Sequence, residues 1–230
     1  MANHDRSRLH TIVPMKPLAE AKTRLGPDVP AQQRQALTAM LLDHVTRVVL
    51  DVTGPHSCTV VGGDDVVKHL AISAGADWAP DPGKDLNYAL WTTMQSAYTS
   101  GATATLYLPG DLPLISPHDV LSIANASDGY TRPVGNRASS DGGTNALLQP
   151  ASAAFKPLLG PDSFANHRAA AHVNGSDLQV LDLPGLSFDL DSIADFQWAT
   201  DNIHGFPANL HDWQVWLYTD HVGPPPRTRR

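Results

Sequence analysis

The sequence predicts an α/β fold in which helices cover a mostly parallel sheet. Short apolar segments alternate with longer amphipathic ones along most of the chain, as strands joined by helical crossovers do. A length of 230 residues suits one well-cored domain and is short for two. Hydrophobic content of 42% and charged content of 17% are ordinary for a globular chain, so we expect one folded unit without repeats.

The first half of the chain contains the clearest elements. In order, we expect a strand at 9–13, a helix at 31–52, a strand at 58–61, a helix from Asp64 or Asp65, a helix at 86–98 and a strand at 103–108. Pro30 suits the start of the first helix, and Asp85 is an N-cap for the third. The last of these strands ends at Pro109, Gly110 and Asp111.

The second half is more irregular. Helices are expected at 116–125, 163–173 and 192–202, and strands at 145–148 and 178–183. Ser116 caps its helix with Pro117 in the first turn, and Ser163 is expected to cap the next. We divide the chain into a domain at 1–204 and a C-terminal extension at 205–230. Trp213 and Trp216 would dock this extension onto the body, and its end is expected to be disordered.

Composition and missing motifs exclude several classes of protein. The net charge of -7 argues against nucleic-acid binding, and no apolar run is long enough to span a bilayer, so we expect a cytoplasmic protein. The single cysteine, Cys58, excludes an intramolecular disulfide framework. There is no P-loop, dinucleotide-binding glycine motif, zinc-protease motif or serine-hydrolase elbow. Acidic residues and a basic loop are left to provide the chemistry.

Acidic side chains form the sharpest candidate site. Asp189 and Asp191 are two residues apart, so an extended backbone directs both to one face, where a shared divalent cation can offset their repulsion. The alternative is a solvated turn in which Asp191 caps the helix near Ser192. Asp111 follows an apolar strand and would lie at the carboxyl edge of the sheet, where open α/β folds bind ligands. A simple turn aspartate is its alternative.

Cationic and small side chains complete the candidate set. Lys16, Lys22 and Arg24 follow the first strand, where nucleotide phosphates would sit, although a cationic loop is more often solvated surface and only the position favours binding. Ser163 after Gly160 opens a helix whose free N–H groups can bind an anion, with plain capping as the alternative. His167 lies in the first turn of that helix.

Two glycines precede Thr144 and allow the backbone to approach a ligand closely, with a simple turn as the alternative.

Seven segments of the chain, taken in order, resemble the CofC/FbiD family, the guanylyltransferases of coenzyme F420 biosynthesis. They are residues 12–18, 81–83, 86–90, 108–114, 141–147, 160–164 and 189–191. The chain departs from the family at Asp85, where glycine is usual.

The resemblance implies a single-domain, Rossmann-like (GT-A-like) nucleotidyltransferase fold with a mixed, mostly parallel sheet. It implies that GTP and a phosphorylated three-carbon acid condense with loss of pyrophosphate, and that Mg²⁺ is the cofactor. The acid would be 2-phospho-L-lactate, phosphoenolpyruvate or 3-phospho-D-glycerate. The product would be handed to the next transferase of the F420 pathway.

The same resemblance assigns residues to roles. Asp111, Asp189 and Asp191 would hold the metal and, with Lys22, form the catalytic set. Thr144, Gly160 and Ser163 would bind the acid, and the nucleotide would contact Pro14, Lys16, Lys22, Arg24, Leu86 and Asn87. Two rival readings keep the nucleotide: a sugar-phosphate or molybdopterin nucleotidyltransferase, and a catalytically silent nucleotide-binding protein. Pro14 to Pro17 replaces the glycine-rich loop typical of the first rival.

Overall fold

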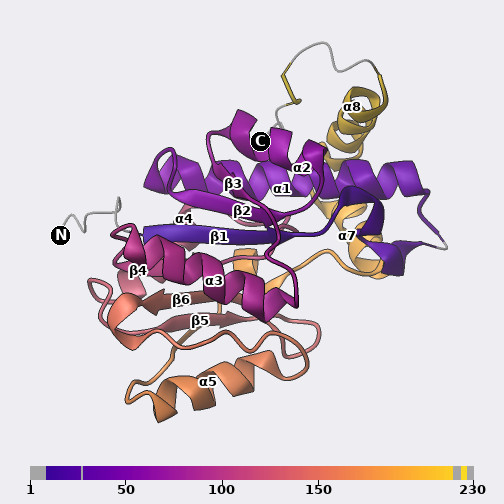
Figure 1. Cartoon of the computed structure of the whole chain (residues 1–230). Coiled ribbons are helices and arrows are strands. Elements are labelled where there is room, and N and C mark those ends of the chain that lie inside the picture. Colours follow the sequence, from indigo (N-terminus) through magenta and orange to yellow (C-terminus); the bar gives the residue numbers. More distant parts are fainter. Residues whose placement is uncertain (1–8, 27, 220–223, 227–230) are drawn as a thin grey trace.

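In the part of the chain that the structure describes, seven strands form one sheet in the order β3-β2-β1-β4-β6-β5-β7 (Figure 1). The structure is a computed structural model that describes residues 9–26, 28–219 and 224–226. The strands are β1 (Leu9–Met15), β2 (Cys58–Gly62), β3 (Asp77–Ala79), β4 (Ala104–Tyr107), β5 (Val134–Arg137), β6 (Thr144–Pro150) and β7 (Gln179–Leu181). Among the strands of the described residues, only β6 runs antiparallel to its neighbours, β4 and β5. The predicted mixed, mostly parallel sheet is therefore confirmed.

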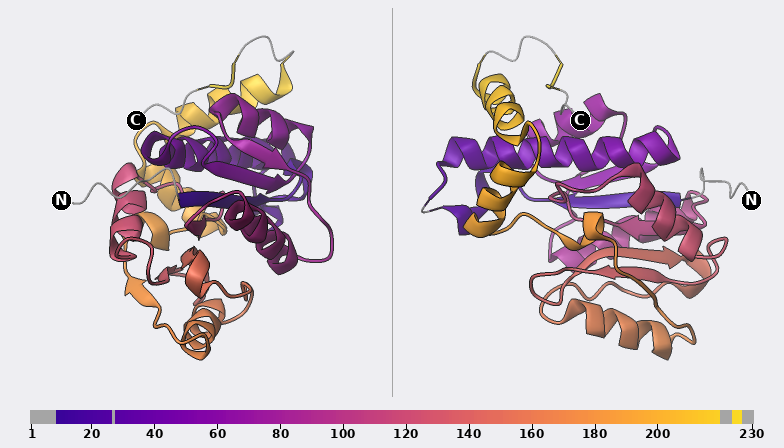
Figure 2. Two further views of the ribbon diagram at one scale, coloured as in Figure 1. Left: turned by 60° about the vertical axis from the view of Figure 1, so that its left-hand side comes forward. Right: turned by 180° about the vertical axis from the view of Figure 1, so that it is seen from behind.

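Helices cover both faces of this sheet (Figures 1 and 2). They are α1 (Ala31–Thr53), α2 (Asp65–Ala74), α3 (Leu86–Thr99), α4 (Pro117–Ala126), α5 (Ser163–Val173), α6 (Pro184–Ser187), α7 (Ile193–Asn202) and α8 (Phe206–Tyr218). α1 and α2 lie on one face, and α3 and α5 lie on the other. Each face has its own apolar core, because strand side chains alternate between the two.

Most predicted helix starts are confirmed, and one is wrong. Asp85 caps α3 by accepting a hydrogen bond from the Tyr88 N–H at 2.8 Å. Ser116 precedes α4 in a capping box. Ser163, however, is the first residue of α5, and its N-cap is Asp162 in a left-handed conformation with φ of 54°. Ser163 does not cap because its hydroxyl is directed to β6 instead.

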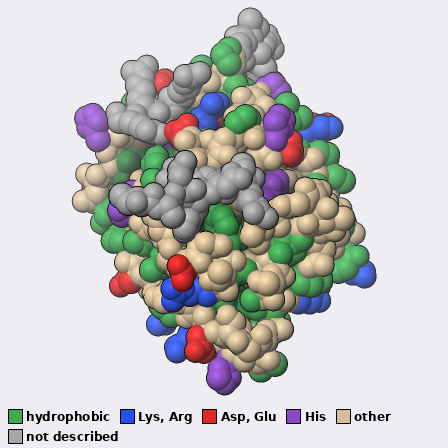
Figure 3. Space-filling view, turned by 90° about the vertical axis from the view of Figure 1, so that its left-hand side faces the viewer, with side chains coloured by type: hydrophobic (Ala, Val, Ile, Leu, Met, Phe, Trp, Pro, Cys, Tyr) green, Lys and Arg blue, Asp and Glu red, His purple; other side chains and the backbone are tan. Residues whose placement is uncertain are grey.

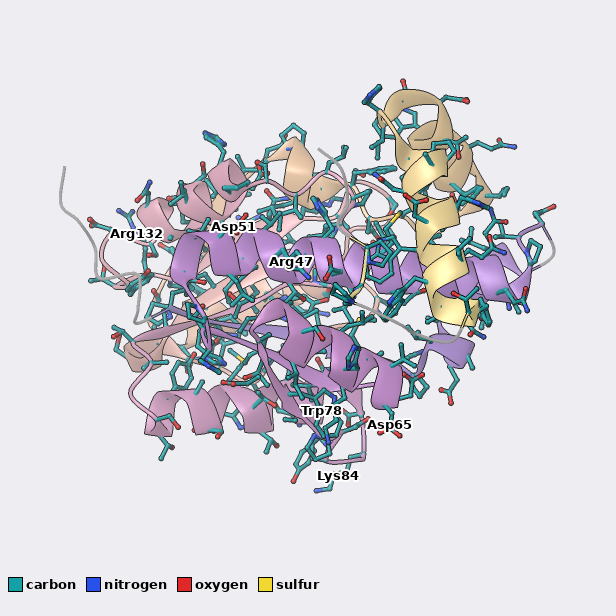
Figure 4. The ribbon with its side chains drawn as sticks, turned by 90° about the horizontal axis from the view of Figure 1, so that it is seen from above. Arg47, Asp51, Asp65, Trp78, Lys84 and Arg132 are labelled. Carbon is teal, nitrogen blue, oxygen red and sulfur yellow. The ribbon has the colours of Figure 1, made fainter. Side chains whose placement is uncertain are left out.

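The short strands β3 and β5 and the helices α6 and α8 are absent from the sequence-based prediction. The most consequential is α8, which crosses α1 in the view from above (Figure 4). Trp213 of α8 is fully buried in the same core as α1, so the docking expected of this tryptophan is present. The predicted disorder at Arg227 to Arg230 concerns residues outside those described. Within the described ranges, no helix has the length and apolarity to cross a bilayer.

Candidate active site

A cavity of about 470 Å³ opens where the parallel strands β1, β2 and β4 end. This carboxyl edge is the usual ligand site of an open α/β sheet. Its lining includes seven of the predicted site residues: Pro14, Lys16, Lys22, Arg24, Leu86, Asp111 and Asp191. The fold therefore brings predicted site residues from four separate segments to one place.

A larger cavity, of about 640 Å³, lies at the opposite, amino-terminal edge of the sheet. His10, His56 and Asp77 are among its lining residues, and none of the predicted site residues is. Figure 3 shows this side of the molecule, where basic, acidic and histidine side chains are scattered among neutral ones. We place the candidate active site in the smaller cavity, because the predicted charged residues converge there and the strand ends favour it.

Three carboxylates lie along this edge because two loops are tied together. The Leu190 N–H donates to the carbonyl oxygen of Asp111 at 3.1 Å, which places the segment 189–191 beside the end of β4. Leu190 is buried while Asp189 and Asp191 are half-buried, as expected when residues two apart share a face. The alternative reading of Asp191 as a helix cap is wrong, because Ser192 caps α7.

Lys22 supplies the counter-charge. Its Nζ lies 2.5 Å from Asp111 Oδ2 and 3.2 Å from Asp191 Oδ1, and its side chain is only 5% exposed. Burial by itself lowers the pKa of this ammonium, but the two carboxylates outweigh burial and raise it. Arg24, at the surface, forms a second ion pair with Asp191 at 2.8 Å. Lys22 is therefore a cation held in place by two acids.

The acidic oxygens suit a divalent cation. Oδ1 of Asp111 is buried and accepts no hydrogen bond from any described residue, so a carboxylate oxygen is left for a ligand. Burial, and then the charges of Asp111 and Asp191, raise the pKa of Asp189, while a hydrogen bond from Asn145 opposes the rise. In the described residues no three acidic, histidine or cysteine side chains converge closely enough to form a finished metal site. Lys22 lies between two of the three predicted ligands instead.

The residues predicted to bind the nucleotide differ in their placement. Leu86 lines the cavity, as does its neighbour Asp85, but Asn87 does not. The Asn87 side chain donates to the Leu159 carbonyl at 3.0 Å and accepts from the Leu159 N–H at 2.7 Å. These two bonds tie the amide to the loop before Gly160 and leave it one N–H and one lone pair for a further partner.

The residues predicted to bind the acid form a separate group beside the cavity. Thr144 and Ser163 are buried and joined through their hydroxyls at 3.2 Å. Gly160 is exposed, with φ of 131°, a conformation that favours glycine. Because β6 is antiparallel, its first residue, Thr144, lies at the same edge as the end of β4. None of the three lines the 470 Å³ cavity.

The sequence-based prediction gave no role to Asn145, which links the two groups. Its side chain donates to Asp189 Oδ1 at 3.1 Å, on the face of β6 opposite to Thr144. Tyr107, which lines the cavity, was also missed. The adjacency of Asn145 to Thr144 in one strand was the available signal for the first residue. Nothing in the sequence distinguished Tyr107 from an ordinary core residue.

Solved structures of other proteins share this fold. The fold matches a nucleotide-diphospho-sugar transferase structure from Desulfovibrio desulfuricans G20, with a TM-score of 0.73, 17% identity and coverage of 92% of this chain and 98% of that one. A manganese complex of a Mycobacterium tuberculosis protein matches with a TM-score of 0.51 and 15% identity, covering 85% of this chain and all of that one. At such identities these structures support the fold.

Sequence comparison gives the family. The family described as "Guanylyl transferase CofC like" matches residues 9–207. A phosphoenolpyruvate guanylyltransferase of Roseiflexus castenholzii is 36% identical over 190 residues, covering 83% of this chain and 87% of that protein. One from Rubrobacter xylanophilus is 36% identical, with coverage of 80% and 89%. The chain therefore belongs to the CofC-like guanylyl transferase family, and the predicted resemblance and enzyme class are confirmed.

Proposed function

We propose that this protein transfers GMP from GTP to phosphoenolpyruvate and releases pyrophosphate. The observation that carries the proposal is the buried Lys22 ammonium between Asp111 and Asp191, in a cavity at the carboxyl edge of the sheet. Such an arrangement brings cation and carboxylates to the point where phosphates bind in this fold class. The choice of phosphoenolpyruvate over 2-phospho-L-lactate or 3-phospho-D-glycerate follows the names of the relatives.

In the proposed reaction, a phosphate oxygen of the acceptor forms a bond to the α-phosphorus of GTP. The bond from that phosphorus to the bridging β-phosphate oxygen breaks, and pyrophosphate leaves with the electron pair. The attacking oxygen is already anionic at neutral pH, so no strong base is needed. The barrier is mainly electrostatic, and Lys16, Lys22 and Arg24 are assigned to neutralise the triphosphate.

Mg²⁺ is the cofactor that we assign to Asp111, Asp189 and Asp191. The unpartnered, buried Oδ1 of Asp111 supports this assignment, because carboxylate oxygens are the ligands that Mg²⁺ prefers. When bound, the cation would supply positive charge to the phosphoryl oxygens. Without the cation, the Lys22 ammonium offsets the negative charges of Asp111 and Asp191.

Thr144, Gly160 and Ser163 are assigned to the acid, and Leu86 to the nucleoside. The product would pass to the next transferase of the F420 pathway in the cytoplasm. The hand-over predicts that the coupled rate exceeds the rate expected from free diffusion of the product between the two enzymes.

The deciding experiment measures pyrophosphate release from GTP with Mg²⁺, with each of the three phospho-acids offered separately. The next enzyme of the pathway and its deazaflavin acceptor are included to consume a labile product. Release with phosphoenolpyruvate and not with the other two supports the proposal. Release with another acid changes the acceptor, and no release with any of them refutes guanylyl transfer to this class of acid.

A further inference from the structure

His167 of α5 is fully buried and holds two separate segments through its two ring nitrogens. The Leu158 N–H donates to Nε2 at 2.8 Å, and Nδ1 lies 2.9 Å from Thr144 Oγ1. Leu158 belongs to the loop that leads to Gly160, and Thr144 begins β6. One imidazole thus joins the loop, the helix and the strand that carry all three residues assigned to the acid.

The donor at Leu158 fixes the tautomer of this ring. A backbone N–H can only donate, so Nε2 must be the accepting, unprotonated nitrogen. The proton of the neutral ring is then on Nδ1, which donates to Thr144 Oγ1. Burial lowers the pKa of His167 to about 4, so the ring is neutral at physiological pH.

The tautomer in turn fixes the role of the Thr144 hydroxyl. Ser163 Oγ also donates to Thr144 Oγ1, at 3.2 Å. A hydroxyl oxygen has two lone pairs and one proton, and both lone pairs are now occupied. Thr144 can therefore enter one further hydrogen bond, and only as a donor. An anionic oxygen of a phosphate or carboxylate is the partner that such a donor suits.

We propose that His167 is a positioning residue that, as the Nδ1–H tautomer, makes the Thr144 hydroxyl a donor directed to the acceptor's anionic group. The proposal rests on the proposed function, because Thr144 is assigned there to the acid. His167 would not touch the substrate. It would act on acceptor affinity through Thr144. The GTP site, assigned to the 470 Å³ cavity that neither His167 nor Thr144 lines, would be unaffected.

Two variants separate the ring's two contacts. In His167→Asn the amide nitrogen falls near the position of Nδ1, so it can still donate to Thr144 while the Leu158 contact is lost. In His167→Gln the amide oxygen falls near Nε2, so it can still accept from Leu158 while the donor to Thr144 is lost. Both variants remove the ring, and each therefore serves as the matched control for the other.

The test measures the KM for the acceptor, the KM for GTP and kcat of both variants and wild type, with melting temperatures as a folding check. We expect His167→Gln to raise the acceptor KM about tenfold, the effect of one lost hydrogen bond to a charged group, with the KM for GTP unchanged. His167→Asn should keep an acceptor KM near that of wild type. An equal rise in both variants, or a rise in neither, overturns the proposal.

A measurement on the wild type covers the case in which the variants do not fold. ¹⁵N NMR of the imidazole distinguishes the Nδ1–H from the Nε2–H tautomer at neutral pH. The Nδ1–H form supports the proposal, and the Nε2–H form or a charged ring refutes it. Absence of pyrophosphate release in wild type is a failure of the proposed function, whereas wild-type activity with an unchanged acceptor KM in His167→Gln is a failure of the inference.

Discussion

Replacing Lys22 with methionine tests the charge arrangement of the candidate site directly. Methionine keeps an unbranched apolar side chain and removes the ammonium that lies 2.5 Å from Asp111 Oδ2 and 3.2 Å from Asp191 Oδ1. Without it, two carboxylates lie close together at a partly buried site and repel each other. We expect Lys22→Met to lower the free energy of unfolding in the absence of metal.

The magnitude follows from the burial of the partners. Removing one member of a fully buried ion pair costs about 3–5 kcal/mol. The Asp111 and Asp191 side chains are 25% and 39% exposed, so solvent screens part of the uncompensated charge. We therefore expect a loss of about 2–3 kcal/mol, which lowers the melting temperature by about 5–10 °C in a chain of this size.

Thermal unfolding, followed by circular dichroism in EDTA and again in millimolar Mg²⁺, measures this effect. Mg²⁺ should raise the melting temperature of Lys22→Met more than that of wild type, because the cation replaces the missing positive charge. Arg24→Met is the matched control: its partner is also Asp191, but its side chain is 77% exposed, so we expect a loss of at most about 1 kcal/mol. Equal melting of Lys22→Met and wild type in EDTA would refute the reasoning.

Three further predictions concern turnover, pH and the C-terminal helix. Asp111→Asn and Asp189→Asn should each reduce pyrophosphate release about a thousandfold or more with unchanged circular dichroism, and near-normal kcat would exclude them as ligands. The pKa of folded His167 is lowered from 6.5 to about 4, so the unfolded chain binds more protons between these values. The contribution of His167 to the free energy of unfolding should fall by up to about 3 kcal/mol as pH decreases through this window. Urea titrations measure the free energy of unfolding against pH, and a dependence in His167→Gln equal to that of wild type would contradict this. Trp213→Ala should cost about 3–5 kcal/mol and Trp213→Phe about 1 kcal/mol, and a smaller loss in Trp213→Ala would mean that α8 is not part of the cooperative core.

The sequence was sufficient for the elements that carry strong local signals. α1 begins after Pro30 and α3 after its Asp85 cap, both as predicted. Three-residue strands such as β3 lack enough residues for a periodic pattern, and they form because a neighbouring strand supplies their hydrogen bonds. The cap of α5 was misplaced because Asp162 and Ser163 both favour that position, and the contact with Thr144 decides between them.

In the candidate site too, features with a local sequence signal were predicted, and features that depend on contacts between distant segments were not. Local patterns placed Asp111 at a strand end and put Asp189 and Asp191 on one face, whereas the grouping of all three came from the family resemblance. The closure of Lys22 onto two of these acids depends on loop geometry, including a left-handed backbone at Lys22 with φ of 53°. The commitment of Asn87 to Leu159 likewise joins segments 72 residues apart, which no single-sequence pattern reports.

The alternating faces of β6 give the site an unusual sensitivity to chain length. Thr144 is directed to Ser163 and His167, and the next residue, Asn145, is directed to Asp189. The whole strand is buried and paired on both edges, so its register cannot shift without disrupting the sheet. Inserting or deleting a single residue within this strand would turn each side chain to the opposite face of the sheet. The contacts of Thr144 with Ser163 and His167 and the contact of Asn145 with Asp189 would then be lost together. In the loop before the strand only residues 139–141 are exposed, so a change of length is tolerated best there, whereas the strand itself should keep its length wherever both sets of contacts are retained.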